Sequence, residues 1–67
     1  MDNLIALFKD MRQKINDLML EMTFGSTAEI VILRGDRKIF QVNAASINAC
    51  TDIAFSKLMD YRKTVLH

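Results

Sequence analysis

Few side chains in this 67-residue chain are able to do acid–base, nucleophilic or metal chemistry. The one histidine, His67, is the last residue, where fraying works against a fixed catalytic geometry. The one cysteine, Cys50, lies on an apolar stripe without a histidine nearby in sequence, which favours a buried structural thiol over a nucleophile. These two residues cannot complete a tetrahedral zinc site. We therefore predict no catalytic, metal-binding or cofactor-binding residues, and a protein that is not an enzyme.

Three basic residues, Arg34, Arg37 and Lys38, surround the dipeptide Gly35-Asp36, which is suited to a tight turn. A basic tip of this kind is able to contact phosphate or a protein partner, and a dimer would present it twice. The alternative interpretation is a charged turn that keeps the edge of a sheet soluble. The net charge of +1 indicates no general attraction to nucleic acid or to membranes.

The elements that would position these residues begin with an amphipathic segment. A 4-3-4-3-4 spacing runs through six apolar residues: Leu4, Phe8, Met11, Ile15, Leu18 and Met22. We predict one helix over residues 2–22, ended by Gly25-Ser26. Its apolar surface is wider than one neighbouring helix could cover. The residues that we expect to contact a second copy of the chain are Ile5, Phe8, Met19 and Leu20.

The middle of the chain has the composition of a β-hairpin. Residues 30–33 and 39–42 are rich in β-branched side chains and lie on either side of Gly35-Asp36. With those two residues as the loop, Ile32 would face Ile39 across the ladder. An isolated hairpin is marginally stable in water, so this one must pack on the helices.

Helical spacing returns after the hairpin, with Ser46 as the expected N-cap. The apolar stripe of this second helix contains Ile47, Cys50, Ala54, Leu58, Tyr61 and Val65. The sequence therefore predicts a single α+β domain over residues 1–67, in the order α-β-β-α, with a long N-terminal helix, a β-hairpin and a C-terminal helix.

The size of the chain bears on its partners. A domain this small buries only about 60% of the surface of its unfolded chain, and one cysteine allows no internal disulfide. Oligomerisation or an unusually good core is then required. No apolar run is long enough to span a membrane, and the first residues lack the pattern of a signal peptide. We expect a cytoplasmic protein that associates with itself and with another protein.

From Asp17 to about residue 60, the order of features resembles the head–tail joining protein W family of lambda-like phages. That family has a helix ending in a segment like Asp17-Leu18-Met19 and a basic turn containing glycine, like residues 34–38. A strand like Ile39-Phe40 follows, and then a serine at the start of a second helix, like Ala45-Ser46. The resemblance implies a structural protein of the virion that docks at the portal of a filled capsid, with the basic turn as a docking point.

These observations favour a small non-enzymatic protein–protein interaction module that forms a homodimer or a larger homo-oligomer through its apolar helix surface. The resemblance adds a role in phage assembly. One alternative is a dimeric regulator that binds nucleic acid through Arg34, Arg37 and Lys38. The other alternative is an inhibitor of another protein.

Overall fold

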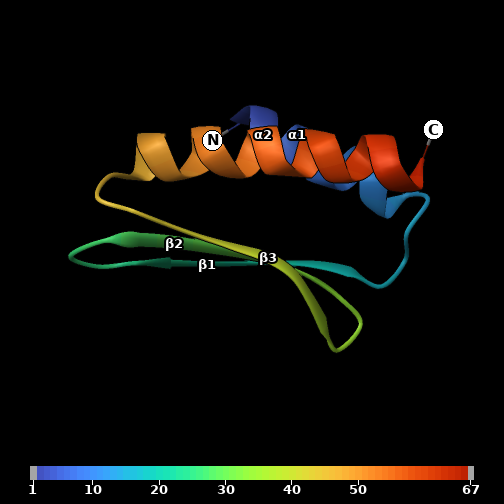
Figure 1. The fold of residues 1–67 in the computed structure, drawn as a ribbon, viewed down its shortest axis with the longest axis horizontal. Helices are drawn as coiled ribbons and strands as arrows, with labels where there is room; N and C mark the ends of the chain where they lie inside the picture. Colours follow the sequence, from blue (N-terminus) through green and yellow to red (C-terminus); the bar gives the residue numbers. More distant parts are fainter. Residues whose placement is uncertain (1, 67) are drawn as a thin grey trace.

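The computed structural model describes residues 2–66. Its elements are α1 (Asp2–Arg12), β1 (Leu18–Phe24), β2 (Ala28–Arg34), β3 (Arg37–Ala44) and α2 (Ile47–Val65). Both helices lie on the same side of a three-stranded sheet, with α1 behind α2 in the view of Figure 1. The strands are antiparallel in the order β1-β2-β3, so β1 and β3 are the edges. The predicted α+β class and the β-hairpin are confirmed.

The segment predicted as the second half of the first helix is a strand. α1 ends where two backbone N–H groups of the following turn donate to the carbonyl of Met11, at 3.0 and 2.9 Å. The prediction of a helix over residues 2–22 is therefore wrong beyond Arg12. Leu18 and Met22 fit a helical spacing of four and a strand spacing of two equally well. Pairing with the apolar strand β2 outweighs the helix propensity of leucine and methionine here.

The β2–β3 hairpin turns at Gly35-Asp36, as predicted, but its register differs from the prediction. Ile32 lies opposite Phe40 rather than Ile39, because Ile39 is an extra residue that forms a β-bulge. In the regular ladder, Gln41 would have faced the helices and Phe40 the opposite side. The bulge instead turns Phe40 toward the core and Gln41 away from it.

The core lies between the helices and the sheet. Its fully buried larger side chains are Leu4, Met11, Leu18, Ile30, Ile32, Cys50 and Leu58. The helices pack on each other, α2 covers β2 and β3, and α1 lies over β1. An ion pair between Arg62 and Asp10 (3.4 Å) joins the exposed sides of the two helices. No helix within residues 2–66 has the length and apolar character needed to cross a bilayer.

The second helix begins as predicted. The Ser46 Oγ accepts a hydrogen bond from the Ala49 N–H (3.1 Å), so Ser46 is the N-cap. The middle of the predicted apolar stripe is buried, at Cys50, Ala54 and Leu58. Ile47, in the first turn, is exposed.

Candidate interaction surface

Successive side chains of β1 point to opposite faces of the sheet. Leu20 lies opposite the fully buried Ile32, so it faces the helices. Met19 lies opposite Leu33 and faces the uncovered side of the sheet, where it is 50% exposed. Two neighbours that would share one flank of a helix are therefore separated by the whole thickness of the sheet.

An open groove of about 460 Å³ lies between α1 and β1. It is lined by Ile5, Phe8, Lys9, Arg12, Gln13 and Leu20. Ile5 and Phe8 are one helical turn apart, beside the buried stripe of α1, and Leu20 rises from the sheet below them. Three of the four residues predicted for self-association thus meet in one apolar groove with a basic rim. Met19 does not join them.

The groove borders a free sheet edge, because within residues 2–66 no strand pairs with the outer side of β1. At the start of β1, the Asp17 carbonyl accepts from the Gly35 N–H (2.9 Å). At its end, the Gly25 N–H donates to the Thr27 carbonyl (3.0 Å). Backbone groups in an antiparallel strand alternate in direction, so the odd-numbered residues of β1 bond to β2. The residues whose N–H and C=O groups point outward are Leu20, Met22 and Phe24.

The outward-pointing residues also carry side chains on the helix side of the sheet. Met22 is half-buried, and Phe24 is 45% exposed. Together they continue the apolar surface along the strand beyond the groove. We call this combined region the α1–β1 surface; it consists of Ile5, Phe8, Leu20, Met22 and Phe24, with the outward backbone groups of β1.

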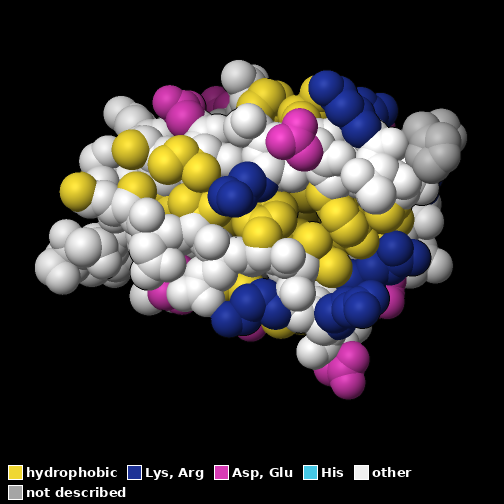
Figure 2. All heavy atoms as spheres, viewed as in Figure 1, with side chains coloured by type: hydrophobic (Ala, Val, Ile, Leu, Met, Phe, Trp, Pro, Cys, Tyr) yellow, Lys and Arg dark blue, Asp and Glu magenta, His cyan; other side chains and the backbone are white. Residues whose placement is uncertain are grey.

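The two edges of the sheet differ in their protection against pairing. β3 carries Arg37, Lys38 and the bulge at Ile39, which are features that prevent edge-to-edge association. β1 is regular along its ladder with β2 and has Glu21 as its one charged residue. Figure 2 shows the α2 and β3 side, where lysine and arginine side chains border the apolar line between helix and sheet. The unprotected edge is therefore the one beside the groove.

Arg34 of the predicted basic tip is engaged within the fold. Its Nη1 donates to the Tyr61 hydroxyl (3.3 Å), and its Nε lies 3.6 Å from Oδ1 of Asp17. The hydrogen bond to Tyr61 is the main cause of a raised pKa for the guanidinium, and Asp17 adds to it. Arg34 thereby connects β2, α2 and the turn before β1.

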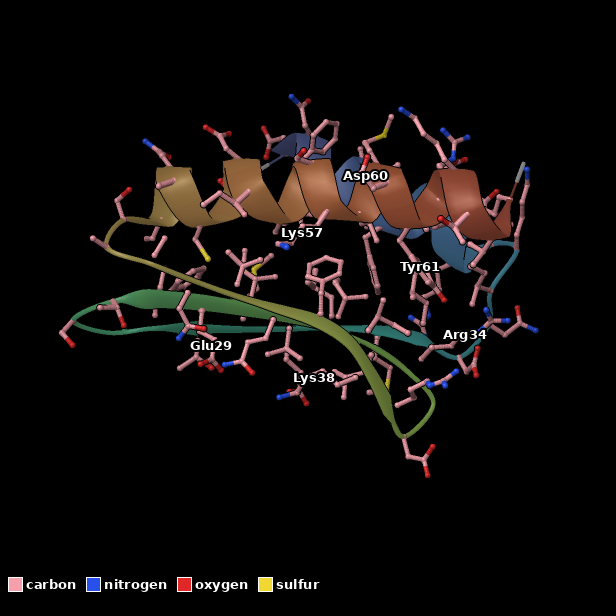
Figure 3. All side chains as sticks on the ribbon, in the orientation of Figure 1. Glu29, Arg34, Lys38, Lys57, Asp60 and Tyr61 are labelled. Carbon is pink, nitrogen blue, oxygen red and sulfur yellow. The ribbon has the colours of Figure 1, made fainter. Side chains whose placement is uncertain are left out.

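Lys38 lies on the other face of the sheet. Its Nζ donates to Oε1 of Gln41 (2.8 Å), and Figure 3 shows Lys38 below the sheet while Arg34 and Tyr61 lie between the sheet and α2. Arg37 is exposed at the turn. The structure therefore spreads the predicted phosphate-contact residues over both faces instead of joining them in one site.

The uncovered face of the sheet carries a network of polar side chains. Gln41 Nε2 and Asn43 Nδ2 both donate to Oε2 of Glu29, at 3.0 and 3.2 Å. Gln41 also donates to Oδ1 of Asn43 (3.2 Å). Val31, in the middle of this face, is only 7% exposed because its neighbours lie over it. Sequence reasoning missed this network, although the alternation of Gln41 and Asn43 with apolar residues in β3 is its signal.

The structure confirms that Cys50 is buried. Its Sγ lies 3.6 Å from the Val42 carbonyl, and burial raises the pKa of the thiol. Within residues 2–66, no three His, Cys, Asp or Glu side chains come together as a metal site would require. His67 lies outside the described residues.

No protein-family model matches the chain, and neither the curated proteins nor the solved structures contain a match. Leu18 and Met19, which the resemblance to the phage joining proteins compares with the end of a helix, lie in β1. That point of similarity is not met. The resemblance itself stays a prediction.

Proposed function

We propose that this chain is a small interaction module without catalytic activity, and that it self-associates through the α1–β1 surface. The observation that supports the proposal is the juxtaposition of the apolar groove with the unprotected edge of β1. Each feature alone is common on a small protein. Side by side, they offer apolar burial and backbone hydrogen bonds to the same partner.

The energies are of the right size for association. Full burial of one Leu- or Phe-sized side chain contributes about 1.5–3 kcal/mol. Ile5, Phe8 and Leu20 are each only half-buried in a single chain, so a partner has apolar area left to cover. A small domain has a total stability of about 0.05–0.15 kcal/mol per residue. Covering this surface would thus stabilise the fold substantially as well as the complex.

The basic residues on the rim of the groove are compatible with a second copy of the chain as the partner. Lys9 and Arg12 border the apolar residues and are exposed. Their long side chains are able to extend into solvent while their stems lie along apolar surface. A second copy of the chain could therefore cover the groove while the charged groups of Lys9 and Arg12 stay in solvent.

Light scattering coupled to size-exclusion chromatography tests the proposal. The wild-type chain is expected to form a dimer or larger oligomer at micromolar concentration. Ile5→Lys removes one apolar contact and places a charge in the groove, and should weaken association by at least about tenfold. Ile53→Lys on α2 is the matched control, because Ile53 is 43% exposed and does not line the groove.

The control variant should associate like the wild type. Circular dichroism is the check that both variants stay folded. A wild-type chain that remains monomeric at high micromolar concentration contradicts the proposal, and so does equal weakening by the two variants.

A further inference from the structure

We propose that two copies pair the free edges of β1 in antiparallel fashion about a two-fold axis at Met22, and that Phe24 of each copy enters the groove of the other. The inference rests on the proposed self-association and specifies its geometry.

The backbone groups limit the choice of register. Antiparallel pairing places outward residues of both copies opposite each other, where each pair exchanges both of its hydrogen bonds. With the axis at Met22, Leu20 lies opposite Phe24 and Met22 lies opposite Met22. All three outward residues of each strand are then satisfied. With the axis at Leu20, the pairs would include Leu18, whose N–H already donates to the Ile15 carbonyl (3.2 Å).

The charge on β1 excludes the intermediate register. With the axis at Glu21, the two Glu21 carboxylates would lie directly opposite each other, which is destabilising. With the axis at Met22, Glu21 lies opposite Thr23, a neutral side chain on the same face of the sheet. Of the three registers, only the one with its axis at Met22 both uses every outward group and avoids a like-charge pair.

The exposed Phe24 of one copy is the side chain that would enter the groove of the other copy. Phe24 is 45% exposed and points to the helix side of the sheet, because it lies opposite the buried Ala28. A two-fold axis perpendicular to the sheet keeps the helices of both copies on the same side. Phe24 of one copy then stands across from Leu20 of the other, at the groove that Ile5 and Phe8 line. Each groove then receives an aromatic ring that is nearly half exposed in the single chain.

The same arrangement limits assembly to two copies. Pairing at β1 joins the two three-stranded sheets into one continuous sheet with helices on one face. Its remaining edges are the two β3 strands, which carry Lys38 and the bulge at Ile39. Protected edges do not add further strands. The interface is isologous, and the assembly closes as a dimer.

Single cysteine variants test the register. In Met22→Cys, the two cysteines would lie opposite each other with Cα atoms about 5.5 Å apart, which suits a disulfide. Mild oxidation is expected to convert this variant to a covalent dimer on a non-reducing gel. Met19→Cys is the control, since its Cα atoms would lie roughly 20 Å apart along the ladder at about 3.4 Å per residue. Cys50 is buried and does not interfere.

Two results would overturn this inference while leaving self-association intact. One is a dimer in light scattering whose Met22→Cys variant does not cross-link. The other is faster cross-linking of Glu21→Cys, which would place the axis one residue away. A monomeric wild type contradicts the proposed function as well. The free edge of β1 would then be expected to pair with a strand of a different protein.

A matched pair of exposed residues tests the role of the phenylalanine. Phe24→Lys is expected to weaken dimerisation at least about tenfold, since a charge replaces the ring in the groove. Ile47→Lys, at 44% exposure on α2, should leave dimerisation unchanged. Both positions are exposed, so both variants should fold. Equal affinity of Phe24→Lys and the wild type would refute the placement of Phe24.

Discussion

Two lysine substitutions at neighbouring residues of β1 test whether this segment is a strand, as observed, or a helix, as its apolar spacing suggests. Leu20 faces the helices and packs partly against the core, whereas Met19 is 50% exposed on the uncovered face. Leu20→Lys should therefore destabilise the fold clearly, and Met19→Lys should change its stability very little.

The burial of each side chain sets the size of the two effects. Full burial of a leucine contributes about 1.5–3 kcal/mol, so the half-buried Leu20 contributes about 1–2 kcal/mol. The lysine would also stand near Lys9 and Arg12 on the groove rim, which adds like-charge repulsion. A surface substitution such as Met19→Lys usually changes the free energy of unfolding by less than about 0.5 kcal/mol. In a domain of this size, 1 kcal/mol corresponds to roughly 4–8 °C in Tm.

Thermal and urea unfolding followed by circular dichroism measure both variants against the wild type. The experiments should be done at the lowest usable protein concentration, because association itself raises the apparent stability. Leu20→Lys is expected to lower Tm by roughly 4–16 °C and Met19→Lys by less than about 4 °C. Equal losses for the two variants would mean that neighbouring residues share one environment, and would refute the assignment of this segment to a two-faced strand.

Two further predictions concern stability. Gly35 has a φ of 65°, a conformation that side-chain-bearing residues rarely adopt, so Gly35→Ala should cost about 1–2 kcal/mol in urea unfolding, although the added Cβ would meet Oδ2 of Asp17 only at an ordinary contact distance of 3.4 Å. Gly25→Ala is its control, with open space around the added Cβ and no positive φ, and a measurable loss there would count against the argument. Burial raises the pKa of the Cys50 thiol, so the unfolded chain loses this proton at a lower pH than the folded chain. The free energy of unfolding should therefore hold steady below the ordinary thiol pKa and fall as the pH rises above it. Urea titrations at several alkaline pH values should show a shallower fall for Cys50→Ala; identical slopes would argue against the shift.

The hairpin and the second helix could be predicted from sequence because local chemistry specifies them. Gly35-Asp36 between β-branched runs demands a turn, since glycine adopts the positive φ found there. Ser46 before a helical apolar stripe marks an N-cap, and the burial of Cys50 follows from its place on that stripe. These signals act over a few residues and need no knowledge of distant contacts.

The register of the hairpin could not be predicted in this way. A two-residue loop allows a regular ladder and a bulged ladder equally. The choice depends on which side chains the helices cover, and the bulge at Ile39 is what places Phe40 on the covered face. The turn itself does not indicate that face; the sequence signal for it is the alternation of Gln41 and Asn43 with Phe40 and Val42.

The sequence by itself determined the α+β class, the turn at Gly35-Asp36, the cap at Ser46 and the set of apolar residues available for burial and association. The tertiary structure alone decided that Leu18–Phe24 is a strand, that Leu20 and Met19 lie on opposite faces, and that Ile5, Phe8 and Leu20 meet in one groove. The physical reason is that apolar residues four positions apart, such as Leu18 and Met22, lie on one face of a helix and also on one face of a strand. Only the neighbouring strand β2, whose backbone groups on the side away from β3 pair with β1, selects between them.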